Sequence, residues 1–422
     1  MKIALIRPRF LGRGDVRERL VHNRLWSPLS LARCARILEE SGSEIKLIDA
    51  QALGLNPGET ARAAGGYDLV LLSTSPIDRW ECPSLDLSPV IGLCRELRRN
   101  RTRIALIGAH GTIRPQEVQK LTGADFVIEG EPESAMVSLG SGETPPKRRA
   151  PVRLDDLPFP AYDLLNVGRY RHLVLGGPCL VLEGSRGCPN NCTICLKAMY
   201  GNGYRTRSGQ GMLSDYRRSI TLGARAVVFI DLDFCLNRSG VEEFCHNLSG
   251  EPGRVPWCCT AHPGSVDGDL LNLMGSAGCR LIHYGIETSS QRILARLGRP
   301  EFKNDLSRVL TQTRAAGIFS LGFFLFGAFD ETEAEREETL RLALSLPLDF
   351  ASFHIATPYP GTAAGDELSP SQPDLFPGVF PGQDRTTLEK WTNRTWRRFY
   401  LRPRILAGLA RARTGRRPRK IG

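Results

Sequence analysis

Residues 180–198 read LVLEGSRGCPNNCTICLKA, a short apolar run followed by a loop with three cysteines. The run 180–183 has the composition of a buried strand. Cys188, Cys192 and Cys195 follow within eight positions, with Gly187 and Pro189 on either side of the first thiol. Three thiols packed this closely in one loop indicate a metal site, provided that the chain is kept in a reducing compartment.

A repeating pattern of strands and helices surrounds this loop. Six βα units predict a partial barrel, in which functional groups gather at the carboxyl ends of the strands. The cysteine loop directly follows the first of these strands, so we expect it at the functional end. The expected strands are 180–183, 226–230, 257–260, 281–286, 321–326 and 350–357, and the helices between them include 242–248, 270–277 and 333–346.

An earlier βα series precedes the barrel. Short apolar strands alternate there with amphipathic helices, which predicts a parallel sheet covered by helices. Ser27 and Pro28 are suited to begin its first helix, on which Cys34 falls on the apolar face. The expected strands are 2–6, 44–48, 68–73, 103–107 and 125–128.

The fold class is therefore α/β, a Rossmann-like parallel sheet joined to a partial (β/α)6 barrel of the TIM type, with a short helical C-terminal region. Gly, Pro, Ser and charged residues are frequent in 138–160, as in a linker. We divide the chain into a Rossmann-like domain (1–137), a linker (138–175), the barrel (176–365) and a C-terminal region with a basic tail (366–422).

Small and polar residues follow the strands of the first sheet. In open parallel sheets, ligands bind beyond the carboxyl ends of the strands, where a close backbone approach favours glycine. We expect a ligand site there, the alternative being tight turns without a ligand. The candidate residues are Thr74, Ser75, Gly108, His110, Gly130 and Glu131.

The three cysteines have the number and spacing to bind three irons of a [4Fe-4S] cluster, which leaves the fourth iron open to a small-molecule chelate. A structural zinc site is the alternative, but it normally has four ligands in paired short spacings. The sequence has no fourth cysteine or histidine close by on the C-terminal side. A two-cluster ferredoxin would need further cysteine runs, which the sequence also lacks.

With the strands around it, the Cys-x-x-x-Cys-x-x-Cys loop resembles the radical S-adenosylmethionine (SAM) enzymes. The stretches VVFIDLDFCLNR (227–238), WCCTAHPGSVDGDLLNLMGSAGCRLIHYGIETSSQRIL (257–294), GFFLFGAFDET (322–332) and ATPYPGT (356–362) are similar to that family's later barrel strands. The resemblance implies that the open iron chelates SAM, and that an electron from the cluster cleaves SAM to methionine and a 5′-deoxyadenosyl radical, which abstracts hydrogen from an unactivated carbon.

The same resemblance assigns residues to SAM. It places Asp231 or Asp233 at the SAM amino group, Glu287 near the ribose or the amino group, and Gly327 against the adenine. His262 stands where the family has an arginine after the third strand, and Ile194 stands where it has an aromatic residue.

The first 135 residues are similar to the cobalamin-binding domain that precedes the barrel in one branch of this family, above all in IGAHGTIRPQEVQKLTGADFVIEGEPE (107–133). This similarity implies a methyltransferase that uses cobalamin to methylate a carbon atom. No Asp-x-His-x-x-Gly motif marks a lower cobalt ligand. The alternative is a cobalamin-independent radical dehydratase or deoxygenase of a sugar diol such as an aminoglycoside.

The short region after the barrel favours a small substrate, for which we expect a secondary metabolite such as an antibiotic precursor. A third possibility is a cobalamin-binding sensor or carrier with a structural cluster, although such a protein would not need SAM-binding residues on each barrel strand. Cys235, Cys258 and Cys259 could donate hydrogen to a product radical or be buried bystanders. Trp80 and Cys82 could line the active site or pack between the domains.

The basic residues concentrate at the end of the chain. Residues 391–422 contain ten arginines and Lys420 and no acidic residue, which accounts for the whole net charge of +11. This tail could bind RNA, and the chain would then be a radical enzyme that modifies RNA. However, Trp391, Trp396, Phe399 and Tyr400 fit a helix packed on the barrel. We expect an electron donor of the flavodoxin, ferredoxin or reductase type as partner, and no nucleic acid.

The sequence also bears on location. The first residues lack the apolar run of a signal peptide, and no apolar stretch approaches the roughly 18 residues of a membrane span. We therefore expect a cytoplasmic protein without a membrane partner, whose cysteines stay reduced.

Overall fold

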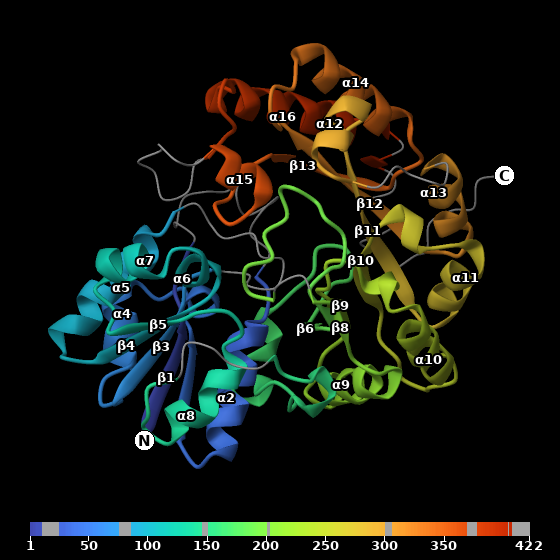
Figure 1. The fold of residues 1–422 in the computed structure, drawn as a ribbon. Helices are drawn as coiled ribbons and strands as arrows, with labels where there is room; N and C mark the ends of the chain where they lie inside the picture. The colour runs from blue at the N-terminus through green and yellow to red at the C-terminus, as the bar shows by residue number, and fades with distance from the viewer. Residues whose placement is uncertain are drawn as a thin grey trace.

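The computed structural model describes residues 1–10, 25–75, 86–145, 151–200, 203–299, 306–368, 378–403 and 405–406. Two parallel sheets face each other across the middle of the molecule (Figure 1). Trp80, Cys82 and the arginine-rich residues 411–422 lie outside the described residues. No described helix combines the length and the apolar character that crossing a bilayer requires.

The first sheet has the strand order β2-β1-β3-β4-β5, with every pairing parallel. The order reverses between β1 and β3, which in doubly wound sheets is where ligands bind. The predicted strands are confirmed to within one residue at each end. They are β1 (Lys2–Arg7), β2 (Glu44–Asp49), β3 (Leu69–Ser73), β4 (Arg103–Ile107) and β5 (Phe126–Ile128).

Both faces of this sheet are covered. Ile3 and Leu5 of β1 pack on the side of α2 (Leu29–Glu40) and α8 (Met136–Gly140), in a core that continues into the barrel. Ala4 and Ile6 point to the opposite side and pack in a separate core with α4 (Pro57–Ala63), α5 (Ser88–Arg99) and α7 (Pro115–Thr122). The period of two along β1 follows from the pleat of a strand buried on both faces.

The expected cap of α2 is wrong. The helix begins at Leu29, Pro28 precedes it, and no side chain among the described residues caps its amino end. Ser27 Oγ instead accepts a hydrogen bond from Val181 N of the barrel, 3.0 Å away. The serine satisfies a backbone amide 154 residues along the chain, a tertiary contact that local sequence rules cannot anticipate.

Residues 151–175 pack between the two sheets rather than crossing solvent. Leu154, Phe159, Tyr162 and Tyr170 are buried. Tyr162 OH donates to Val181 O at 2.6 Å, and Tyr170 OH donates to Asp49 Oδ2 at 2.7 Å. The segment therefore fastens the barrel to the first sheet through buried hydrogen bonds.

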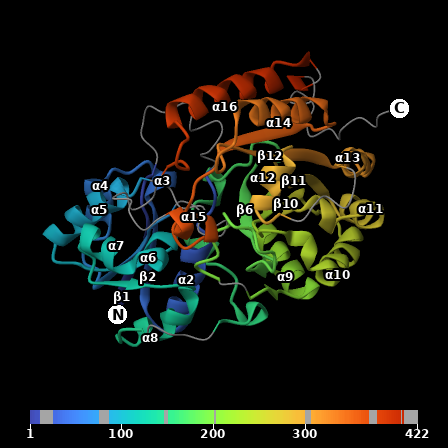
Figure 2. The ribbon, with the colours of Figure 1, turned by 45° about the horizontal axis from the view of Figure 1, so that its top comes forward.

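The second sheet is the partial barrel, with strand order β13-β12-β11-β10-β9-β6 and every pairing parallel. Figures 1 and 2 show its strands in an arc, with helices on the outer side and the concave side turned to the first sheet. All six predicted strands are present. They are β6 (Cys179–Leu182), β9 (Ala226–Phe229), β10 (Trp257–Ala261), β11 (Cys279–Glu287), β12 (Phe319–Phe326) and β13 (Phe350–Ile355).

The outer helices are α9 (Gly209–Thr221), α10 (Arg238–Ser249), α11 (Gly268–Ser276), α12 (Gln291–Arg296), α13 (Leu306–Ala315) and α14 (Glu333–Ser345). The C-terminal helix α16 (Arg385–Tyr400) packs on β13, as its aromatic spacing predicts. Trp391 and Phe399 are buried, and Tyr400 OH donates to Ala351 O at 2.7 Å.

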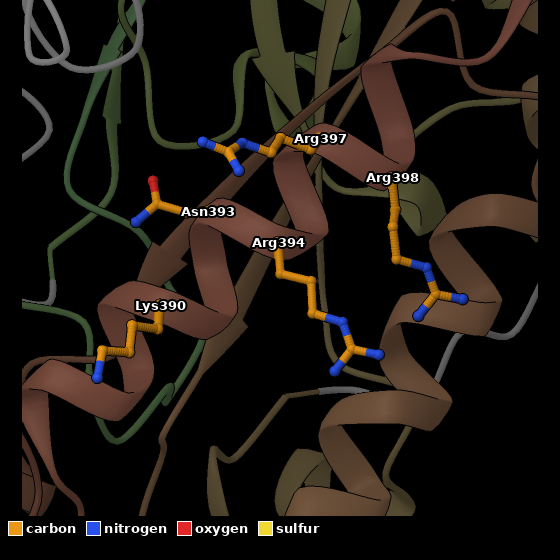
Figure 3. A pocket seen from close by; sticks show the side chains of 5 residues that line it. All are labelled: Lys390, Asn393, Arg394, Arg397 and Arg398. Atoms are coloured by element: carbon orange, nitrogen blue, oxygen red, sulfur yellow. The ribbon is translucent and has the colours of Figure 1, made fainter.

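The outward face of α16 is basic. Figure 3 shows Lys390, Asn393, Arg394, Arg397 and Arg398 around an open hollow on this helix.

Candidate active site

The cysteine loop begins as the barrel's first strand ends. A two-residue antiparallel ribbon follows β6 and forms the base of the loop, with β7 (Ser185–Arg186) paired to β8 (Arg205–Thr206). Lys197 Nζ bridges the loop by donating hydrogen bonds to two of its carbonyl oxygens, Cys188 O at 2.9 Å and Asn190 O. Thr193 N donates to Leu297 O at 2.9 Å and fixes the far side of the loop.

The three thiols influence one another. Hydrogen bonding from Cys195 lowers the pKa of Cys192 to about 6, and the nearby charges of Arg299 and Lys197 act in the same direction. Burial raises the pKa of Cys188. A thiol that ionises near neutral pH is ready to bind metal, because the thiolate is the ligand.

Arg299 is a site residue that the sequence analysis missed. Its guanidinium pairs with Glu287, whose backbone adopts a φ of 68° where β11 ends. The backbone reaches the cysteine loop closely, since a Cβ on Gly298 would lie 2.6 Å from Asn191 O. The positive charge of Arg299 therefore lies among the three cysteines and Glu287, which together raise its pKa against the effect of burial. No motif in the sequence around Arg299 marks this position.

Asp231 and Asp233 follow β9, and each is engaged with the protein. Asp231 accepts hydrogen bonds from Gly184 N at 3.0 Å and from Ser185 Oγ, so it holds the start of the cysteine loop. Asp233 accepts from Ser265 Oγ at 2.6 Å and from Cys235 N at 3.2 Å. Burial raises the pKa of Asp231 to about 7 and that of Asp233 to about 6.

Thiolate, carboxylate and guanidinium groups thus converge at the carboxyl ends of the barrel strands. Residues 182–343 match the radical SAM superfamily. These residues form a radical SAM domain. The matched range contains the three cysteines, Asp231, Asp233, Glu287, Arg299 and Gly327.

The resemblance to known proteins extends beyond the residues that match the radical SAM superfamily. The chain is 27% identical over 359 residues to an uncharacterized methyltransferase of Pyrococcus horikoshii, covering 79% of this chain and 77% of that one. Its fold is similar to the radical SAM methyltransferase TsrM of Kitasatospora setae with cobalamin and a [4Fe-4S] cluster bound, with a TM-score of 0.68, 16% identity, and coverage of 87% and 74%.

A second solved structure extends the likeness over almost the whole chain. The cobalamin-dependent radical SAM enzyme OxsB, with aqua-cobalamin and SAM bound, superposes with a TM-score of 0.71 and 16% identity over 97% of this chain and 70% of that one. The two-sheet architecture of the chain is therefore shared with these two solved structures, as the sequence resemblance predicts.

His262 and Gly327 have structural roles in the radical SAM domain. Burial and the charge of Arg299 lower the pKa of His262 to about 4, so the imidazole is neutral at pH 7 and does not replace the charge of an arginine. Gly327 adopts a φ of 78°, and a Cβ there would lie 2.4 Å from Leu388 Cδ1 of α16. The positive φ and the position of Leu388 both favour glycine here, and its contact with adenine stays a prediction.

The candidate ligand residues of the first sheet lie together at the carboxyl ends of β3, β4 and β5. Ser75 Oγ is 3.3 Å from His110 Nδ1, and both residues are fully enclosed. Thr74 Oγ1 donates to Ile107 O at 3.0 Å. Gly108 and Gly130 adopt φ angles of 115° and 70°, which favour glycine.

This edge touches the radical SAM domain just beyond the cysteines. Ala109 forms one apolar cluster with Leu196, Met199 and Tyr200. A Cβ on Gly130 would lie 3.6 Å from Met199 O. The two groups of predicted site residues, one on each sheet, are therefore separated by a single short segment, 196–200.

Within the described residues, His172, Cys258 and His283 form a buried group whose potential ligand atoms lie within 4.8 Å of one another. His172 Nδ1 accepts hydrogen bonds from Val174 N and Leu175 N, at 3.2 and 3.1 Å. The proton of this neutral imidazole is then on Nε2, where a metal would bind. The tautomer disfavours a metal site.

Two further barrel cysteines, Cys235 and Cys259, have outward positions. Cys235 Sγ lies 3.9 Å from Met274 Sδ of the outer helix α11, and the thiol of Cys259 is hydrogen-bonded to those of Cys235 and Cys279. Cys258 instead lies beside His283, which faces Phe323 across the inner side of the sheet. Cys258 is thus the thiol placed on the concave side, and a role as hydrogen donor stays a prediction.

Proposed function

We propose that this chain is a cobalamin-dependent radical SAM methyltransferase that methylates a carbon of a small molecule, for which a secondary metabolite is our candidate. In this proposal residues 1–137 bind cobalamin, residues 176–365 bind the cluster and SAM, and residues 138–175 join the two. The observation that carries it is the contact between Ala109, at the edge of the first sheet, and Leu196 and Met199, which follow the cysteines.

The donor set fits a [4Fe-4S] cluster. Cys188, Cys192 and Cys195 are soft ligands on one closed loop, and one of them already ionises near neutral pH. When bound, the cluster and SAM supply the radical that removes hydrogen from the substrate carbon. Lys197 holds the loop closed, Asp231 fixes its start, and Arg299 provides a positive charge beside the thiolates and Glu287.

Glycines and small polar residues at the edge of the first sheet support the assignment of cobalamin to this edge. The positive φ angles at Gly108 and Gly130 allow a close backbone approach, and Thr74 and Ser75 are short and polar. A large planar ligand at this edge would have to displace the side chains of Leu196 and Met199 from Ala109. Cobalamin, if bound there, would supply the methyl group.

The test is a cofactor inventory followed by product analysis. Anaerobically reconstituted protein should contain about four irons and four sulfides per chain, bind hydroxocobalamin, and release 5′-deoxyadenosine from SAM with dithionite. Hydroxocobalamin should protect amides of 105–115 and 128–135 from hydrogen exchange. The Cys192→Ala variant should lose iron and SAM cleavage, whereas the matched control Cys245→Ala, buried on α10, should keep both.

Each other outcome is informative. SAM cleavage without hydroxocobalamin binding would overturn the proposed methyltransferase activity and support the alternative, a radical dehydratase. Zinc in place of iron, without cleavage, would overturn both reactions. Transfer of an isotopically labelled methyl group from SAM to a candidate substrate would identify the carbon that is methylated.

A further inference from the structure

Arg186 lies two residues before Cys188 and is 2% exposed. Its guanidinium contacts three carboxylates that come from two domains. Nε donates to Glu183 Oε2 at 3.0 Å, Nη1 to Glu131 Oε2 at 2.9 Å, and Nη2 to Glu133 Oε1 at 2.7 Å. Glu183 follows β6 of the barrel, whereas Glu131 and Glu133 follow β5 of the first sheet. A single side chain therefore joins the base of the cysteine loop to the edge of the first sheet.

The far side of the cysteine loop reaches the same guanidinium. The ring of Tyr200, five residues beyond Cys195, has its centroid 5.3 Å from Arg186 Cζ. Arg205, paired with Arg186 across the β7–β8 ribbon, also bonds to Glu131 and donates to Val152 O at 2.7 Å. Both ends of the loop are thus anchored on one buried group.

These contacts belong to an extended ion network. Arg33 of α2 lies 3.4 Å from Glu183 and 3.3 Å from Asp215, and Arg207 lies 2.9 Å from Asp215. The eight least exposed members of the network are Arg33, Arg186, Arg205, Arg207, Glu131, Glu133, Glu183 and Asp215, and the more exposed Asp155 lies 3.8 Å from Arg207. Replacing one of these arginines by lysine keeps the charge and changes the geometry alone.

Geometry is where the two cations differ. A guanidinium presents five donors in a rigid plane and can hold three carboxylates at fixed angles, whereas an ammonium is a compact charge on a flexible stem. Arg186→Lys would therefore preserve charge while releasing at least one of the three contacts. The position most directly affected is the loop that starts two residues later.

We propose that Arg186 is a positioning residue for the three-cysteine loop, through which Glu131 and Glu133 of the first sheet set the properties of the bound cluster. This inference rests on the cluster in the proposed function and is independent of cobalamin and of the methylated substrate. It predicts that substitutions at Glu131 or Glu133 change the EPR spectrum of the bound cluster although no cysteine is replaced.

The test compares Arg186→Lys with Arg207→Lys, a control of similar burial in the same network that does not contact Glu131 or Glu133. The readouts are iron content, the EPR spectrum of the dithionite-reduced protein with and without SAM, and the rate of SAM cleavage without substrate. We expect Arg186→Lys to retain iron, to show a changed EPR spectrum with SAM, and to cleave SAM about tenfold more slowly. Arg207→Lys should resemble the wild type.

Glu133→Gln provides a second variant on the first sheet, should Arg186→Lys fail to fold, and it should change the EPR spectrum in the same direction. Wild-type spectra and rates in both Arg186→Lys and Glu133→Gln would overturn the inference, as would an equal change in Arg207→Lys. Wild-type protein without a cluster would instead overturn the proposed function and the inference with it.

Discussion

Arg299 donates a hydrogen bond to Glu287 where β11 ends, and its charge also acts on the thiol of Cys192. Replacing Arg299 by methionine removes one of the charges that favour the Cys192 thiolate. We expect the pKa of this thiol in metal-free protein to rise above its value of about 6. The measurement is the pH profile of Cys192 alkylation by iodoacetamide, read by mass spectrometry.

The control for this prediction is Arg296→Met. Arg296 is more exposed than Arg299 and pairs with Asp330 rather than with Glu287. Its replacement should leave the alkylation profile in place. An unchanged profile in Arg299→Met would show that Cys195 and Lys197 account for the low pKa of Cys192 without Arg299.

Glu331 gives the fold a pH dependence that can be isolated. Burial raises the pKa of this carboxyl from 4.5 to about 7, and one of its oxygens accepts a hydrogen bond from Gly327 N at 2.5 Å. The folded protein therefore binds a proton between pH 4.5 and 7 that the unfolded chain has released. The free energy of unfolding falls as pH rises through this window.

Glu331→Gln keeps an acceptor for Gly327 and removes the charge. Relative to the wild type, its free energy of unfolding should increase between pH 4.5 and 7.5, by up to about 3 kcal/mol. Urea unfolding of both proteins across this range provides the comparison. Parallel curves for the two proteins would contradict the raised pKa.

Gly327→Ala should destabilise the fold for two reasons. The positive φ costs an alanine about 1–2 kcal/mol, and contact with Leu388 adds about 1–3 kcal/mol of overpacking. In a double-mutant cycle, Leu388→Ala should relieve the second cost and leave the first. Urea unfolding measures both. Additive effects would show that Leu388 does not restrict this position.

Tyr170→Phe tests the fastening of residues 151–175 to the first sheet. The phenol donates to the carboxylate of Asp49, which also pairs with Arg7. Loss of this buried hydrogen bond should cost about 1–2 kcal/mol. Tyr67→Phe, at a partly exposed position, should cost less in the same thermal unfolding experiment. Equal losses of stability would mean that the hydrogen bond to Asp49 contributes no more than the hydroxyl of a partly exposed tyrosine.

Local sequence was sufficient for the strands and for the cysteine loop. Short apolar runs predict parallel strands because such strands are buried on both faces. The three thiols lie within eight positions of the sequence. The aromatic spacing 391–400 likewise predicts α16 and its packed face. These features depend on residues within one turn or one strand of each other.

The residues that sequence reasoning missed depend on distant partners. Arg186 bonds to carboxylates 53 and 55 positions away, and Ser27 meets an amide 154 positions away. An arginine or serine on a loop has no local pattern that distinguishes such a role from a solvated one. Arg299 lies only 12 positions from Glu287, but the turn that joins them is set by the close approach of Gly298 to the cysteine loop.

The ion network between the sheets has a consequence for how the sequence can diverge. Removing one partner from a buried ion group leaves an uncompensated charge, at a cost of about 3–5 kcal/mol. Loss of Glu133, for example, would leave Arg186 paired with Glu131 and Glu183 at a reduced free energy of unfolding, and a neutral residue at position 186 would restore the balance. Among related chains, substitutions at these positions should therefore occur together. A chimera that joins the first sheet of one relative to the barrel of another should fold stably when the charges at these positions match.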